Sequence, residues 1–190
     1  MLPADLLDRL LPDAEPIARW EEASPPRDLP EGAEVTRFAP SPTGFLHIGG
    51  VYTAAVAKEL AERSGGTYLV RIEDTDQARA VEGSDEHFAR AFAHFGIGPT
   101  EPADAPWGPY RQSERAAIYR SHVRHLLEAD RAYPCFATKD ELAELTDRQQ
   151  AAKVDIGYWG EWAAWRDAEP ERVTAALDAA VAAQADWAAT

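Results

Sequence analysis

The most informative segment of the chain is Arg37-Phe-Ala-Pro-Ser-Pro-Thr-Gly-Phe-Leu-His-Ile-Gly-Gly50. Its first residues belong to a predicted buried strand, residues 35–39, which the two prolines bring to an end. Beyond the segment, apolar spacing predicts a helix over residues 51–63 that ends at a Gly-Gly turn. The free N–H groups and the positive dipole end of such a helix form an anion site. The segment is neither a dinucleotide fingerprint nor a P-loop, because neither glycine pattern is present.

The rest of the chain alternates between helical and strand patterns. β-forming residues predict a second strand over residues 67–72. Further elements are predicted as a short amphipathic helix and an extended linker within residues 1–33, helices over 84–95, 138–150 and 171–187, a helix with Ser113 as its N-cap running to about Asp130, and a short β-like stretch at 132–136. The order strand, helix, strand, helix predicts an α/β fold with a parallel sheet.

Carboxylates gather where the second strand ends, in the sequence Arg71-Ile-Glu-Asp-Thr-Asp76. Ligands of open α/β sheets sit beyond the carboxyl ends of the strands. There Glu73 could bind an amino group, and Arg37 could bind a carboxylate as a bidentate fork. Together they would hold an amino acid with an acidic side chain. For Asp74 and Asp76, capping of the next helix is an equal alternative.

His47 and the glycines at positions 49 and 50 stand at the predicted helix start. A histidine there can donate a hydrogen bond to phosphate oxygens, and glycine lets a nucleotide approach the backbone. A histidine in a loop without any ligand is the alternative.

Composition narrows the class of protein. The chain has 190 residues, of which 45% are hydrophobic and 27% charged, so about one globular domain is expected. A net charge of −14 argues against a free-standing nucleic-acid module. Its apolar runs are shorter than the roughly 20 residues of a membrane span, and no secretory signal pattern is present, so we expect a cytoplasmic protein without membrane contact. Cys135 is the only cysteine, which excludes an intrachain disulfide.

Residues 36–50, 71–76 and 108–113 resemble the catalytic half of glutamyl-tRNA synthetase, a class I aminoacyl-tRNA synthetase. The amino-terminal extension and residues 157–166 resemble one bacterial branch of that family, so the resemblance covers residues 1–170. It implies the amino-terminal half of a Rossmann-like nucleotide-binding fold, with a parallel sheet and flanking helices. The expected function is that of a glutamate–tRNA ligase, which activates glutamate with ATP and transfers it to the 3′ end of tRNA.

The resemblance also implies a division of the chain and a set of site residues. The domains would be 1–33, a helical extension and proline-rich linker; 34–136, the first half of the catalytic domain; and 137–190, the helical part of a connective insertion with an alanine-rich tail. Glutamate would be held by Arg37, Ala39, Ser41 and Glu73. The catalytic, ATP-binding residues would be Thr43, His47, Gly49 and Gly50, and Asp76 and Arg79 would approach the tRNA acceptor end.

Two departures from the family pattern shape these expectations. The second class I signature, Lys-Met-Ser-Lys-Ser, is absent, because Met1 is the only methionine and all three lysines lie elsewhere. We therefore expect the isolated chain to be inactive or weakly active. The expected nucleotide substrate of the family reaction is ATP with Mg²⁺. Some relatives bind zinc through several cysteines, so with a single cysteine no zinc or other metal site is expected.

Three further expectations concern partners and alternatives. An exposed sheet edge favours self-association or pairing with a missing carboxy-terminal half. The chain could instead be a short non-catalytic paralogue that binds or regulates. It could also belong to an enzyme that passes activated glutamate to an acceptor other than glutamate tRNA.

Overall fold

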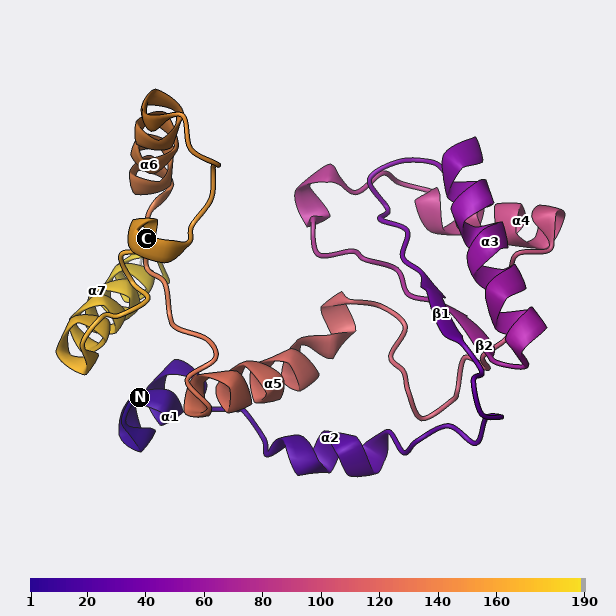
Figure 1. The fold of residues 1–190 in the computed structure, drawn as a ribbon, viewed down its shortest axis with the longest axis horizontal. Coiled ribbons are helices and arrows are strands. Elements are labelled where there is room, and N and C mark those ends of the chain that lie inside the picture. The colour runs from indigo at the N-terminus through magenta and orange to yellow at the C-terminus, as the bar shows by residue number, and fades with distance from the viewer. Residues whose placement is uncertain (189–190) are drawn as a thin grey trace. The chain divides into compact units, whose positions relative to one another are not determined.

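The structure, a computed structural model, describes residues 1–188 and the side-chain surroundings of residues 1–184. The chain divides into two compact units, one formed by Glu15–Tyr119 and the other by Met1–Ala14 together with Arg120–Thr190. The helices and strands are α1 Ala4–Leu10, α2 Ile17–Ala23, β1 Val35–Phe38, α3 Ile48–Ser64, β2 Thr67–Val70, α4 Ser84–Phe95, α5 Ala116–Glu128, α6 Lys139–Ala152 and α7 Pro170–Ala188 (Figure 1).

A parallel pair of strands organises the Glu15–Tyr119 unit. Strand β1 pairs with β2 in the register Val35↔Thr67 to Phe38↔Val70. Parallel neighbours need a crossover connection, and α3 supplies it by packing along both strands (Figure 1). The expected α/β fold with a parallel sheet flanked by helices is therefore confirmed.

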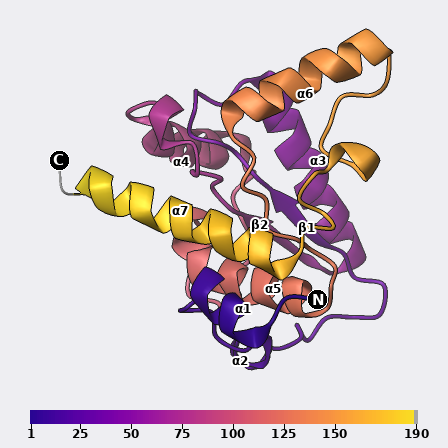
Figure 2. The ribbon, with the colours of Figure 1, turned by 90° about the vertical axis from the view of Figure 1, so that its left-hand side faces the viewer.

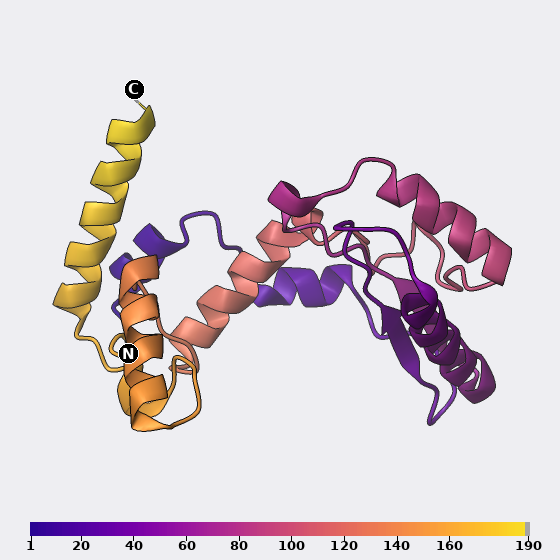
Figure 3. The ribbon, with the colours of Figure 1, turned by 90° about the horizontal axis from the view of Figure 1, so that it is seen from above.

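The hydrophobic core of this unit lies between the sheet and its helices. Strand alternation directs Phe38 and Tyr68 into a cluster with Ala54, Ala61 and Ile97. Helix α4, the magenta helix at the upper right of Figure 3, contributes Phe92, whose ring meets that of Phe38 edge-on at 6.1 Å. The face of the sheet carrying Arg37 is left for other contacts.

The turn between α3 and β2 requires two glycines. Gly65 ends α3 with a φ of 70°, in the left-handed region that glycine adopts freely. At Gly66 a Cβ atom would lie 1.9 Å from the carbonyl oxygen of Glu34, so the close approach of two backbones excludes any side chain.

A third segment extends the sheet beside the end of β2. Ile72 donates its N–H to the Tyr110 carbonyl at 3.0 Å, and its own carbonyl accepts from Gln112 at 2.9 Å. The resulting parallel bridge between Ile72 and Arg111 brings the loop after α4 to the strand ends.

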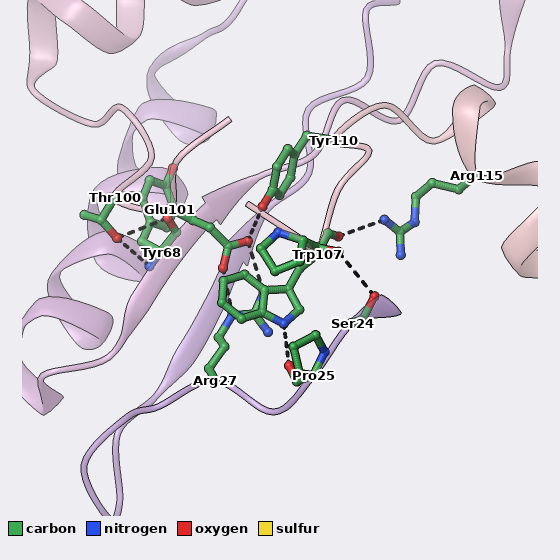
Figure 4. Close-up of polar contacts among 10 residues, drawn as sticks. Ser24, Pro25, Arg27, Tyr68, Thr100, Glu101, Trp107, Tyr110 and Arg115 are labelled. Carbon is green, nitrogen blue, oxygen red and sulfur yellow. Dashed lines mark hydrogen bonds and ion pairs between the residues drawn. The ribbon is translucent and has the colours of Figure 1, made fainter. Parts of the chain in front are cut away.

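The predicted extended linker docks on that same loop. Arg27 donates from Nε and Nη2 to the two carboxylate oxygens of Glu101 at 2.7 and 3.0 Å (Figure 4). Its guanidinium also stacks on Trp107, 4.2 Å from the ring centroid, while the Trp107 indole donates to the Pro25 carbonyl at 2.7 Å. The phenol of Tyr110 donates to Glu101 at 2.6 Å. The linker is thus fixed by charge-assisted contacts to residues more than 70 positions away.

The second unit contains α1, α6 and α7 and the part of α5 from Arg120 onward. Helix α1 buries Leu6 and Leu7, and α7 buries Val173. The two helices contact each other, as Figure 2 shows. Arg124 of α5 donates to Asp8 of α1 at 2.6 Å. The predicted amphipathic amino-terminal helix is therefore present.

Several predicted elements are confirmed and others are wrong. The predicted helices over 84–95, 138–150 and 171–187 correspond to α4, α6 and α7. The predicted β-like stretch at 132–136 forms no strand in the described part of the chain. Ser113 is not the N-cap of α5, because it lies inside a 3-10 turn and its hydroxyl donates to Asp74. Helix α2 was missed, and α3 begins three residues earlier than expected.

The domain boundaries at residues 33 and 136 are not tested by the two compact units and stay predictions. The last two positions of the predicted 137–190 region lie outside the described residues. Among the described helices, none combines the length and the apolar character needed to cross a membrane.

Candidate active site

The candidate site lies where the two parallel strands end. Their backbone ladder continues past the strands, with Arg71 N–H donating to the Phe38 carbonyl at 3.0 Å and Glu73 N–H donating to the Pro40 carbonyl at 2.9 Å. Residues 39–41 and 71–73 therefore run side by side at the carboxyl edge of the sheet, the edge at which open α/β sheets bind ligands.

Arg37 and Glu73, the two side chains expected to hold an amino acid, meet at this edge. Arg37 Nη1 donates to Glu73 Oε1 in an ion pair whose side chains are 39% and 30% exposed. Arg71 Nη2 lies 3.7 Å from the same carboxylate oxygen. The three charged groups thus form one cluster that solvent can reach.

Sequence reasoning missed Arg71 as a member of this cluster. Alternation along an extended segment places residues 71 and 73 on the same face, and that pattern was available from the sequence. Of the other predicted glutamate-binding residues, Ala39 is partly buried and Ser41 is exposed, both on the neighbouring segment.

His47 caps the amino-terminal end of α3. Its ring Nδ1 accepts the N–H of Gly49 at 3.2 Å, which satisfies one of the free donors of the helix start. This bond assigns the proton of a neutral ring to Nε2, and the exposed ring is free to donate from that atom. Thr43, the other predicted phosphate-facing residue, is partly buried in the loop that leads to the helix.

The two glycines after His47 have a local reason to be small. A Cβ atom at Gly49 would lie 3.0 Å from His47 Cε1, and one at Gly50 would lie 2.5 Å from Cδ1 of Leu46. A side chain at either position would therefore have to displace the His47 ring or the end of the Leu46 side chain, independently of any ligand.

Asp74 holds the segment that contains Arg111 and Ser113 against the carboxyl end of β2. Its buried carboxylate accepts the N–H and hydroxyl of Ser113, at 2.9 and 2.8 Å, and Nη1 of Arg111 at 2.9 Å. Burial by itself would raise the pKa of Asp74, but these hydrogen bonds outweigh it and hold the pKa below its usual value. Asp74 therefore acts as a buried structural anchor for the Ser113 segment, and not as the expected surface cap of the next helix.

Asp76 and Arg79, the predicted tRNA contacts, pair with each other. Asp76 caps a 3-10 turn over Gln77–Arg79, because its Oδ1 accepts the Arg79 N–H at 3.2 Å and its Oδ2 accepts Arg79 Nε at 2.6 Å. The following residue Val81 donates to the Pro42 carbonyl at 2.8 Å, which ties this turn to the proline loop. In the part of the chain that the structure describes, no group of three or more potential metal ligands occurs.

Comparison with known proteins shows which family the chain resembles. Residues 34–173 match the family described as tRNA synthetases class I (E and Q), catalytic domain. The glutamate–tRNA ligase of Clostridium perfringens (strain 13 / Type A) is 45% identical over 164 residues, covering 83% of this chain and 30% of the relative. The corresponding ligase of Acetivibrio thermocellus is 42% identical over 180 residues, covering 91% of this chain and 33% of the relative.

Solved structures give the same relationship. The crystal structure of a glutamate tRNA ligase from Elizabethkingia meningosepticum in complex with its amino acid has a TM-score of 0.66 and 40% identity, and covers 78% of this chain and 30% of that one. The glutamate–tRNA synthetase of Elizabethkingia anophelis has a TM-score of 0.67 and 38% identity, with 77% and 31% covered. The chain therefore spans about a third of the length of these relatives, and it belongs to the class I tRNA synthetase family, E and Q type, within the catalytic domain.

Proposed function

We propose that this chain carries the glutamate-binding and ATP-binding half-site of a glutamate–tRNA ligase. The observation that supports this most directly is the meeting of Arg37 and Glu73 at the sheet edge. An amino acid with an acidic side chain presents an ammonium group and a second carboxylate, so it complements both charges at once. The capped start of α3 follows in the same loop.

In the proposed complex, glutamate exchanges places with the internal ion pair. The Glu73 carboxylate binds the α-ammonium group, and the Arg37 guanidinium binds the side-chain carboxylate through two parallel N–H bonds. Ala39 and Ser41 line the adjoining segment. Arg71, 3.7 Å from Glu73, keeps that carboxylate oriented when Arg37 turns to the ligand.

ATP, with Mg²⁺, is the proposed second substrate. An α-carboxylate oxygen of glutamate attacks the α-phosphorus, the bond to pyrophosphate breaks, and glutamyl-adenylate forms. His47 Nε2 donates to phosphate oxygens as negative charge grows there, and Thr43 with the glycines at 49 and 50 forms the loop around the phosphates. No protein nucleophile is needed, so positioning supplies the rate.

Transfer to tRNA is proposed as the second step, in which a terminal ribose hydroxyl takes the glutamyl group and AMP leaves. Asp76 and Arg79 are the proposed contacts to the acceptor end. Because this sequence has no Lys-Met-Ser-Lys-Ser segment, the isolated chain turns over slowly or not at all. Action on tRNA would place the protein in the cytoplasm, and pairing with a second copy or a carboxy-terminal half remains part of the proposal, as do the boundaries at residues 33 and 136.

Thermal unfolding with a non-hydrolysable glutamyl-adenylate analogue tests the proposal. A ligand at 100 times its Kd stabilises the fold by about 2.7 kcal/mol. For a chain of this size each kcal/mol raises Tm by roughly 2–4 °C, so a rise of roughly 5–10 °C is expected. The aspartyl analogue serves as the ligand control and should give a smaller shift.

Variants assign the shift to the site. Arg37→Gln and Glu73→Gln should abolish it, whereas Arg63→Gln, an exposed arginine on α3, should preserve it. No shift in the wild-type chain at saturating ligand, or an undiminished shift in both site variants, would refute the half-site. A specific shift together with no glutamyl transfer to tRNA would leave the binding site standing and point to another acceptor or to a non-catalytic role.

A further inference from the structure

One pocket of the Glu15–Tyr119 unit is lined by three arginines. It measures about 220 Å³, and Arg27, Arg71 and Arg115 contribute to its lining together with Trp107 and Tyr110. Figure 4 shows Arg27 and Trp107 between the linker and the loop that follows α4, with Tyr110 on that loop and Arg115 to its right. Neither Arg37 nor Glu73 lines it.

The positive charges of this pocket are only partly compensated. Glu101 is taken by Arg27, whose Nε and Nη2 it accepts, and by the Tyr110 phenol. Arg71 shares the carboxylate of Glu73 with Arg37. Arg115 donates through Nη1 to the carbonyls of Trp107 and Pro109, at 3.2 and 2.9 Å, and forms no ion pair with any described residue. In a chain of net charge −14, the pocket is thus a local region of excess positive charge.

Two of the guanidinium groups also have unsatisfied donors. The Nε atoms of Arg71 and Arg115 are shielded from solvent and have no hydrogen-bond partner among the described residues. A buried charged donor without an acceptor is costly, and the charge of a guanidinium is shared over all three nitrogens. A negative charge placed in the pocket against the outer nitrogens would offset part of that cost.

The size and chemistry of the pocket define its ligand. A volume of about 220 Å³ is below the roughly 300–1,000 Å³ of pockets that enclose drug-sized ligands, so a small group fits better than a nucleotide. The Ser24 hydroxyl, held by only a long 3.4 Å bond to the Pro106 carbonyl, adds a donor at the rim. We propose that this pocket binds a compact oxyanion of the phosphate class through the guanidinium groups of Arg71 and Arg115. This inference does not rest on the proposed half-site.

The test follows the arginine Nε–H signals by ¹⁵N–¹H NMR of the full 190-residue chain. Sodium phosphate is added up to about 50 mM at constant ionic strength, so that general screening is the same throughout. The Arg115 and Arg71 signals should shift along one saturable curve, while the signal of the exposed Arg63 should stay in place. A parallel titration with glycerol 3-phosphate distinguishes free phosphate from a phosphate group on a small carrier.

Two kinds of variant keep the test independent of folding. Arg115→Met removes the unpaired charge and should weaken binding by at least about tenfold. Ser24→Glu adds a carboxylate at an exposed rim position and should weaken it similarly, whereas Ser24→Gln, its neutral isostere, should stay within about twofold. Saturable binding of either phosphate compound that Ser24→Glu removes and Ser24→Gln retains supports the site. Shifts that fail to saturate, or that persist unchanged in Ser24→Glu, overturn it.

Discussion

Replacing Arg27 with methionine removes one half of an ion pair whose other half is buried. The Glu101 side chain is 1% exposed and that of Arg27 20% exposed, so little solvent can take over when the guanidinium is lost. Among the described residues, Glu101 would keep only the Tyr110 phenol as a donor. The stacking of Arg27 on Trp107 disappears with the same substitution.

The expected cost follows from these contacts. Removing one partner of a buried pair destabilises by about 3–5 kcal/mol, because the remaining charge is uncompensated. The lost cation–π contact adds about 0.5–1 kcal/mol, which lies within that spread. Replacing both partners with apolar residues of similar size is nearly neutral in comparable cases, so Arg27→Met combined with Glu101→Leu should recover at least about 2 kcal/mol.

Urea unfolding, monitored by tryptophan fluorescence, measures both variants against the wild type. Because Trp107 stacks on Arg27, the substitution itself can change the fluorescence of that tryptophan. Far-ultraviolet circular dichroism should therefore serve as a second probe of the same transition. The reasoning fails if Arg27→Met costs less than about 1 kcal/mol, the usual value of an exposed pair. It also fails if the double variant is as unstable as the single one.

Three other substitutions test separate features of the fold. Gly66→Ala should destabilise by about 1–3 kcal/mol in urea unfolding, because its Cβ would meet the Glu34 carbonyl, whereas Gly98→Ala, with open space around it, should cost little. Tyr68→Phe should be neutral or stabilising by up to about 1–3 kcal/mol in the same assay, since burial raises the pKa of Tyr68 to about 12 and its hydroxyl has no partner among the described residues. Asp74→Asn should destabilise most at neutral pH, because hydrogen bonds that outweigh burial hold the pKa of Asp74 below its usual 3.8. That stability is present above pH 3.8 and lost as the pH falls through the lowered pKa, so thermal unfolding should show the gap to the wild type closing in acid.

Local patterns predicted the elements that depend on neighbours in the sequence. Helix α4 was predicted with both of its ends correct, because its apolar spacing is regular and Gly96 adopts the left-handed conformation that ends it. Helix α2 was missed because it has seven residues and buries none of them, which leaves no periodic apolar face to detect. At residues 132–136 β-forming residues are present, but no strand pairs with them in the described chain. The rings of Tyr133 and Phe136 instead contact those of Tyr158 and Trp165 in tilted arrangements.

The site shows the same division between local and distant causes. The charges of Arg37 and Glu73, and their positions near the carboxyl ends of the two predicted strands, were readable from the sequence, and the parallel sheet brings them together. The role of Ser113 was not readable, because its hydroxyl bonds to a carboxylate 39 positions earlier. The Arg27–Glu101 pair spans 74 positions, so composition and spacing give no sign of it.

The ion pair between Arg37 and Glu73 makes amino-acid binding an exchange. Under the proposed function, two new ion pairs form while one existing pair breaks, so the net gain is a single pair of charges. Added salt weakens the internal pair as well as the new ones. The affinity for glutamate should therefore fall with ionic strength only about as steeply as for one charge contact. The pair also leaves Arg37 without an uncompensated charge before the ligand binds, so a small stray anion gains little by binding to that guanidinium.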